Sequence, residues 1–231
     1  MKRGILNILL VAVSIIAFNA CENDYEDYSS GDIWISMGLV ETNTMGYDFV
    51  IYCDNGDTLL PAVNAASNFE TYNQQRVIAN YTILDNVDSS AQLYYAQINN
   101  LYEVLYKDII ELTSSNADSL GNDPVQIQDI WVVKNMLNIE FQYLGNNKTH
   151  YINLAYTTNE NGEIEKPVEL EFRHNANDDD EALTLDGIVT FKLDKLQTDE
   201  GLSEGENSFD FSITATNYQD EEQTFTGTFD Y

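Results

Sequence analysis

The sequence predicts an all-β protein in which a small barrel is followed by an antiparallel β-sandwich. Apolar and polar residues alternate along most of the chain with the period of two that places one face of a strand in a core. Turn-forming residues separate these segments at short intervals. A polar stretch near the middle divides the expected strands into about five, which suits a small barrel, and about seven, which suits a sandwich.

The alternation is clearest in the second half of the chain. In residues 137–143, four apolar side chains alternate with Asn138, Glu140 and Gln142. The same pattern predicts half-buried antiparallel strands at 168–172, 189–193, 209–213 and 225–231.

Turn and helix signals complete the expected elements. Residues 54–57 (DNGD) contain the Asn-Gly pair that favours a tight turn between strands. Lys134-Asn135 predicts a two-residue hairpin connection. The only helices that the pattern suggests are short ones around 61–72 and 100–112.

A domain boundary is predicted where polar residues displace apolar ones. Residues 113–124 (TSSNADSLGNDP) are rich in Ser, Asn, Asp, Gly and Pro. We therefore expect a first domain at 32–112 and a second at 118–231, meeting near 113–121, where few contacts should cross.

The N-terminus has the layout of a bacterial export signal. Lys2 and Arg3 precede an apolar run from Ile5 to Phe18. At about 1.5 Å rise per residue such a run is short of the roughly 30 Å hydrocarbon core that a membrane-spanning helix must cross. Residues 1–20 are predicted to be a cleaved signal peptide, and the pattern around Cys21 resembles a lipoprotein lipobox.

Lipidation of Cys21 would attach the protein to a membrane through several acyl chains, which hold stably where a single chain does not. Residues 21–31 would form an acidic tether that holds the domains away from the bilayer. Its first acids also resemble a signal that sends lipoproteins to the outside of the outer membrane. These candidate export residues are Glu22, Asp24, Glu26 and Asp27. We therefore expect an outer-membrane lipoprotein, with the cell surface favoured over the periplasmic face.

Charge excludes some partners. Removal of residues 1–20 leaves 8 basic against 39 acidic residues, a formal charge of −31. Such a field repels nucleic acid and favours cationic partners or divalent ions. Residues 31–112 carry only Arg76 and Lys107 as basic groups, so no nucleic-acid binding is expected from the barrel.

No residue set predicts catalysis, a cofactor or a metal site. Cys53 lacks a partner once Cys21 is lipidated, and it is expected to be a small buried core residue. His150 and His174 lack zinc-ligand spacing and are expected to be ordinary strand or strand-end residues. The acidic loop 177–181 has hard-oxygen groups that suit calcium, but it lacks the EF-hand spacing and is better explained as a solvated loop.

Several segments together resemble NigD-like lipoproteins of the Bacteroidota. They are 53–61 (CDNGDTLLP), 75–84 (QRVIANYTIL), 118–154 and the lipobox, and the resemblance covers essentially the whole mature chain. It implies an N-terminal OB-like barrel and a C-terminal β-sandwich, with no catalytic residues to transfer. Thr58 and Ser119 lie in Asp-Thr-Leu and Asp-Ser-Leu motifs similar to O-glycan acceptors in these bacteria.

Two functions remain open from the sequence. The first is a non-catalytic binding module in the envelope that contacts an unidentified protein or glycan. The alternative is immunity, in which an acidic protein neutralises a cationic bacteriocin; the family name comes from linkage to a bacteriocin locus. Coplanar exposed aromatic residues would favour glycan binding, whereas a concentrated acidic concave surface would favour the toxin.

Overall fold

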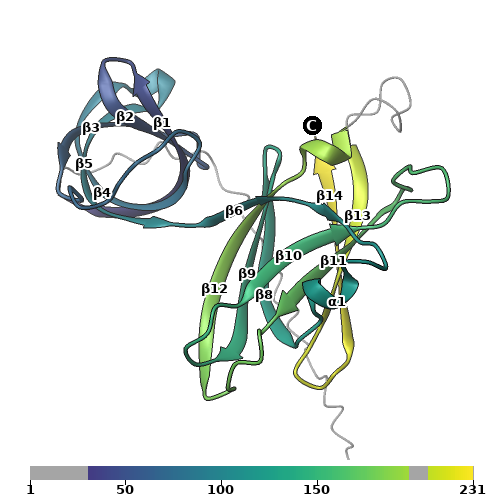
Figure 1. The fold of residues 1–231 in the computed structure, drawn as a ribbon. Helices are drawn as coiled ribbons and strands as arrows, with labels where there is room; N and C mark the ends of the chain where they lie inside the picture. The colour runs from purple at the N-terminus through teal and green to yellow at the C-terminus, as the bar shows by residue number, and fades with distance from the viewer. Residues whose placement is uncertain (1–30, 198–207, 231) are drawn as a thin grey trace, which may run out of the picture.

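The computed structural model describes residues 31–197 and 208–230, which form two all-β domains (Figure 1). The first is a closed barrel and the second contains two further sheets. This confirms the predicted fold class. Within the described residues, no helix is both long and apolar enough to cross a membrane.

The barrel closes because its first strand pairs with strands on both sides. Its strands are β1 (Ile33–Thr44), β2 (Tyr47–Cys53), β3 (Thr58–Asn64), β4 (Arg76–Asp88) and β5 (Leu93–Glu103), and a 3₁₀ turn at Ser89–Ala91 joins the last two. Their order around the barrel is β1-β2-β3-β5-β4. Along β4, Val77, Ala79, Tyr81 and Ile83 fill the interior, so the alternate side chains of this strand point outward.

The sandwich consists of a five-stranded and a four-stranded sheet. The first has the order β14-β13-β11-β10-β7 and the second the order β6-β12-β9-β8. The strands are β6 (Leu105–Asp108), β7 (Ile110–Glu111), β8 (Val125–Val133), β9 (Met136–Gly145), β10 (Tyr151–Tyr156), β11 (Val168–Asn175), β12 (Leu183–Lys192), β13 (Ser208–Thr216) and β14 (Glu222–Asp230).

Aromatic rings fill the space between the two sheets. Phe141 of β9 meets Phe172 of β11 edge to face, with ring centroids 5.1 Å apart. Phe191 of β12 continues this row at 6.3 Å from Phe172. Gly187 lies opposite Phe141, and a Cβ atom there would come within 2.5 Å of the ring. The missing side chain at Gly187 therefore makes room for the central aromatic residue of the core.

Three strand pairs of the sandwich are parallel, which the sequence pattern did not predict. They are β7 with β10, β6 with β12, and β11 with β13. Alternation of apolar and polar residues identifies a half-buried strand but not the direction of its neighbour. The parallel pairs arise from long connections, which only the folded chain reveals.

Both predicted helices are wrong. Residues 61–64 continue strand β3, and the chain is irregular from 65 to 75. Residues 100–112 end β5 and then form β6 and β7. Short apolar runs have no decisive period, and here pairing with neighbouring strands decided their structure. At Pro61 the pairing with β5 shifts register, as expected for a residue without a backbone N–H.

The chain passes from barrel to sandwich near Val104, earlier than the boundary predicted at 113–121. β6 and β7, within 105–111, belong to the two sandwich sheets. The polar stretch instead holds helix α1 (Ala117–Leu120), whose Leu120 is buried. Ser, Asn and Asp mark an exposed connection, but they do not distinguish one inside a domain from one between domains.

Other local predictions are confirmed. β2 ends at Cys53 and β3 begins at Thr58, so 54–57 is the expected turn. Val133 pairs with Met136 across the two-residue connection at 134–135. Cys53 is buried in the barrel core, and burial raises the pKa of its thiol far above the ordinary value.

A fully buried arginine joins the two domains. Arg76 of β4 forms two hydrogen bonds with the carboxylate of Asp54, at the end of β2. From the same side chain, Nη2 donates to Asn138 of β9 at 3.0 Å and Nε donates to Thr190 of β12 at 3.3 Å. The Thr190 hydroxyl in turn donates to Asn138 at 2.7 Å. One guanidinium therefore links the barrel to the central strands of the sandwich.

Candidate functional site

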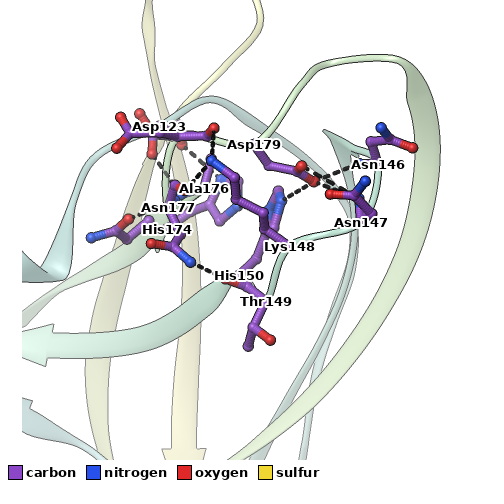
Figure 2. Close-up of polar contacts among 12 residues, drawn as sticks. Asp123, Asn146, Asn147, Lys148, Thr149, His150, His174, Ala176, Asn177 and Asp179 are labelled. Atoms are coloured by element: carbon purple, nitrogen blue, oxygen red, sulfur yellow. Dashed lines mark hydrogen bonds and ion pairs between the residues drawn. The ribbon is translucent and has the colours of Figure 1, made fainter.

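Two histidines meet at one end of the sandwich (Figure 2). His150 immediately precedes β10, and His174 lies near the end of β11. These strands are antiparallel, with Ile152 opposite His174, so their ends bring the rings together. Nδ1 of His150 lies 2.8 Å from Nε2 of His174, and the rings stack with centroids 5.0 Å apart. The prediction that both are ordinary strand residues missed this pairing.

Asp179 holds the other side of His150. Its Oδ2 lies 3.2 Å from Nε2 of His150 and accepts the backbone N–H groups of Asn146 at 2.5 Å and Asn147 at 3.1 Å. Burial alone would raise the pKa of this carboxyl, but these N–H groups and His150 hold the pKa well below its usual range. Asp179 is therefore a fixed anion.

The histidine pair also contacts a backbone carbonyl. Nδ1 of His174 faces the carbonyl oxygen of Asp123 at 3.3 Å, so it must donate and Nε2 of that ring must accept. His150 lies between the two partners, with Nδ1 facing His174 and Nε2 facing Asp179. These three contacts form a continuous array from the carbonyl of Asp123 through both imidazole rings to the carboxylate of Asp179.

Protonation of both facing nitrogens would place two N–H groups against each other. Burial and the neighbouring His150 both lower the pKa of His174 below its ordinary value. Burial therefore favours the neutral form of His174.

An acidic pocket of about 420 Å³ opens beside this array. Its lining residues are Asp123, Pro124, Leu144, His174, Ala176, Asp178, Asp179, Glu181, Tyr218 and Asp220. Two of the five acids serve the scaffold, because Asp179 holds His150 and Asp123 accepts the backbone N–H of Ala176 at 2.6 Å. Among the described residues, Asp178, Glu181 and Asp220 pair with no lysine or arginine. The pocket therefore has a net negative charge.

The wall formed by the β13–β14 connection adds a polar group without a partner. The Asn217 side chain accepts the N–H groups of Gln219 at 2.8 Å and Glu221 at 2.9 Å, which fixes this turn. The turn carries Tyr218, whose hydroxyl oxygen is buried with no hydrogen-bond partner in the described part of the chain. Because an unsatisfied buried hydroxyl is costly, this group is available to a ligand or to water.

The acidic loop 177–181 forms one rim of this pocket, but the carboxylates do not converge as metal ligands. Within 31–197 and 208–230, no three His, Cys, Asp or Glu residues are arranged to hold a metal ion. Lys148 Nζ contacts the backbone carbonyls of Asn177 and Asp178 rather than their side chains. The loop thus presents its carboxylates to the pocket.

The other predicted sites lie elsewhere. Cys21 and the candidate export residues Glu22, Asp24, Glu26 and Asp27 fall outside the described residues. Thr58 is half-buried at the start of β3, where β2 and β5 flank it, whereas Ser119 is exposed on α1. Of the two glycan motifs, only Ser119 is thus openly accessible, and glycosylation stays a prediction.

The sequence contained one weak signal for the histidine pair. His174 lies three positions before the predicted acidic loop at 177–181, and the chain has only two histidines. Their meeting depends on the register between β10 and β11, which residue spacing does not reveal. Tyr218 and Asp220 come from a third segment, and no local pattern connects them to the histidines.

The fold defines this chain as a two-domain protein with an OB-type barrel and a β-sandwich. The model of the NigD-like N-terminal OB domain matches residues 37–104, and that of the NigD-like C-terminal beta sandwich domain matches 108–228. The chain belongs to the NigD-like family, which confirms the resemblance seen in the sequence.

Solved structures share this architecture. A provisionally named toxin-related protein of Parabacteroides distasonis is 30% identical with a TM-score of 0.70, covering 86% of this chain and 94% of that one. A NigD-like immunity protein of Bacteroides caccae is 20% identical (TM-score 0.65; 86% and 94% covered). A provisionally named lipoprotein of Bacteroides fragilis is 11% identical (TM-score 0.57; 86% and 96% covered). No curated protein shows significant similarity to the chain.

Proposed function

We propose that this chain is a non-catalytic outer-membrane lipoprotein that binds a cationic group of an envelope protein through the acidic pocket. The observation that carries this proposal is the convergence of Asp178, Glu181 and Asp220 on one concave site without a cationic partner in the described residues. Charge complementarity of this kind steers association and selects partners.

The pocket favours a protein partner over a neutral glycan. Half of its lining residues are acids, and Tyr218, its one phenol ring, offers a hydroxyl rather than a stacking platform made of several rings. Lysine or arginine side chains would suit both the carboxylates and the Tyr218 hydroxyl, because they carry positive charge and donate hydrogen bonds.

The lipid anchor is supported by the sequence around Cys21. A positive start, an apolar run and a cysteine at its end together favour export and lipidation. The structural relative from Bacteroides fragilis is also named as a lipoprotein. Attachment to the outer membrane, on its outer face, would place the pocket where it meets partners of the envelope.

Immunity against a cationic bacteriocin is the second candidate. The structural relative from Bacteroides caccae is named an immunity protein, and an acidic pocket is the feature that would bind a cationic toxin. Expression of the protein in a bacteriocin-sensitive strain tests this candidate directly. Protection from killing would favour immunity, and unchanged killing would exclude it for the toxin used.

The pocket itself is tested by capture from intact envelopes with a charge-matched control. The pocket variant carries Asp178→Asn, Glu181→Gln and Asp220→Asn. The control variant has the same change in net charge at exposed positions away from the pocket: Glu140→Gln, Glu160→Gln and Glu165→Gln. We expect the pocket variant to lose a salt-sensitive partner that both wild type and control retain. Equal capture by all three proteins would refute the proposal.

A further inference from the structure

The outer wall of the barrel carries an exposed apolar stripe without charge. Ile33 and Ile35 of β1 are 68% and 69% exposed, and Tyr102 of β5 is 57% exposed. The barrel stripe is defined as Ile33, Ile35, Met37, Ile78, Leu84 and Tyr102. Strand register joins three of its members across three strands, because Met37 lies opposite Ile78 on β4 and Ile78 lies opposite Tyr102.

The amide and hydroxyl side chains beside the stripe are neutral and hydrogen-bonded, whereas the exposed acids Asp32, Asp85 and Glu103 adjoin its ends in sequence. Asn99 accepts the amide of Gln97 at 2.8 Å and donates to Asn80 and Thr82, each at 3.1 Å. Asn100 donates to the Tyr102 hydroxyl at 2.8 Å. These amides have few free groups for sugar hydroxyls, and the only aromatic ring of the stripe is Tyr102. The surface is therefore poorly suited to a glycan.

We propose that the barrel stripe docks on the lipid surface to which Cys21 anchors the chain. This inference depends on the lipid anchor of the proposed function. Ile33 follows Cys21 by twelve positions in the sequence, and at about 3.5 Å per residue even an extended chain would hold it within roughly 40 Å of the anchor. Docking is then intramolecular, so a modest apolar surface is sufficient. In this proposal the tether limits the reach of the barrel and does not act as the spacer expected from its sequence.

Charge also favours this occupant. The protein has a formal charge of −29 before processing and would be repelled from an anionic membrane over most of its surface. The stripe and the amides beside it carry no charge, so repulsion from lipid is weaker over this face than over the rest of the surface. Exposed Ile, Leu and Tyr side chains suit the boundary between headgroups and acyl chains.

The test uses the lipidated full-length protein in vesicles of phosphatidylethanolamine and phosphatidylglycerol. An environment-sensitive dye is attached through Ile35→Cys, with Thr184→Cys, exposed on β12 of the sandwich, as the control position. Native Cys53 is buried and should not react. We expect brominated lipids to quench the dye at 35 and to leave the dye at 184 unquenched.

Removal of the stripe should abolish the signal without removing the anchor. In the labelled Ile35→Cys protein, Ile33→Ser, Leu84→Ser and Tyr102→Ser together should eliminate quenching while the protein still floats with the vesicles. Flotation without quenching of the protein with an intact stripe would refute docking and leave the anchor intact. Absence of flotation would refute the anchor and docking with it. If the dye at position 35 reports the same apolar environment in the absence of vesicles, a second copy of the chain or the tether covers the stripe. This result would also refute docking.

Discussion

Replacing Arg76 by Met should destabilise the barrel by about 3 kcal/mol, the lower end of the range for breaking a buried ion pair. The Arg76 side chain is fully buried and that of Asp54 is 15% exposed. The change leaves the Asp54 carboxylate largely out of water without its cation. Because that carboxylate keeps some solvent contact, the loss should not reach the top of the range.

The same substitution should lower the free energy of unfolding of the sandwich much less than that of the barrel. Asn138 and Thr190 each lose one donor, but they remain hydrogen-bonded to each other at 2.7 Å. Loss of these hydrogen bonds should therefore cost the sandwich about 1 kcal/mol. The barrel should then unfold at a lower urea concentration than the sandwich.

Each domain contains one of the two tryptophans, which makes this difference measurable. Trp34 packs against the barrel core and Trp131 lies on β8. Urea unfolding followed in Trp34→Phe and Trp131→Phe backgrounds reports the sandwich and the barrel separately.

Lys192→Met is the matched control, because it breaks an ion pair with Asp108 whose side chains are 33% and 67% exposed. Exposed pairs contribute about 1 kcal/mol or less. If Arg76→Met lowers the free energy of unfolding of the barrel no more than Lys192→Met does, the reasoning about the buried junction is refuted.

Three further outcomes are expected. Gly187→Ala should destabilise the sandwich by about 1–3 kcal/mol, because a Cβ atom there would press on Phe141; unfolding with no change in midpoint would contradict this. Burial lowers the pKa of His174 in the folded protein. As the pH falls below about 6.5, the His174 side chain therefore binds a proton in the unfolded chain before it does so in the folded protein. Wild-type stability should then fall with decreasing pH, by at most about 1.4 kcal/mol per unit, and His174→Gln should flatten that slope in urea titrations at pH 7 and pH 5. Cys21→Ala should release the protein from membranes washed with carbonate, and retention in the pellet would contradict the lipid anchor.

The strands could be predicted because local sequence records which side chains face a core. Leu137, Ile139 and Phe141 alternate with polar residues, and all three are buried in the sandwich. The turns at 54–57 and 134–135 were predictable for the same reason, since a short connection depends on its own residues. The likeness to the NigD-like family was also visible in short segments, and the domain matches confirm it.

The junction and the pocket could not be predicted because distant segments form them. Arg76 is 114 positions from Thr190, and Asp179 is 29 from His150. No periodicity links such residues, since their proximity depends on strand register and on the parallel pairing of β6 and β7 with sandwich strands.

The sequence by itself determined the strands, the excess of acidic charge and the candidate lipid anchor, because each depends on neighbouring residues or on composition. Only the tertiary structure decided where the acidic charge is concentrated. It brought Asp178, Glu181 and Asp220 to one pocket and placed His150 between Asp179 and His174. The physical reason is that hydrogen bonding and charge act through space over a few ångströms, and the folded chain alone sets those distances.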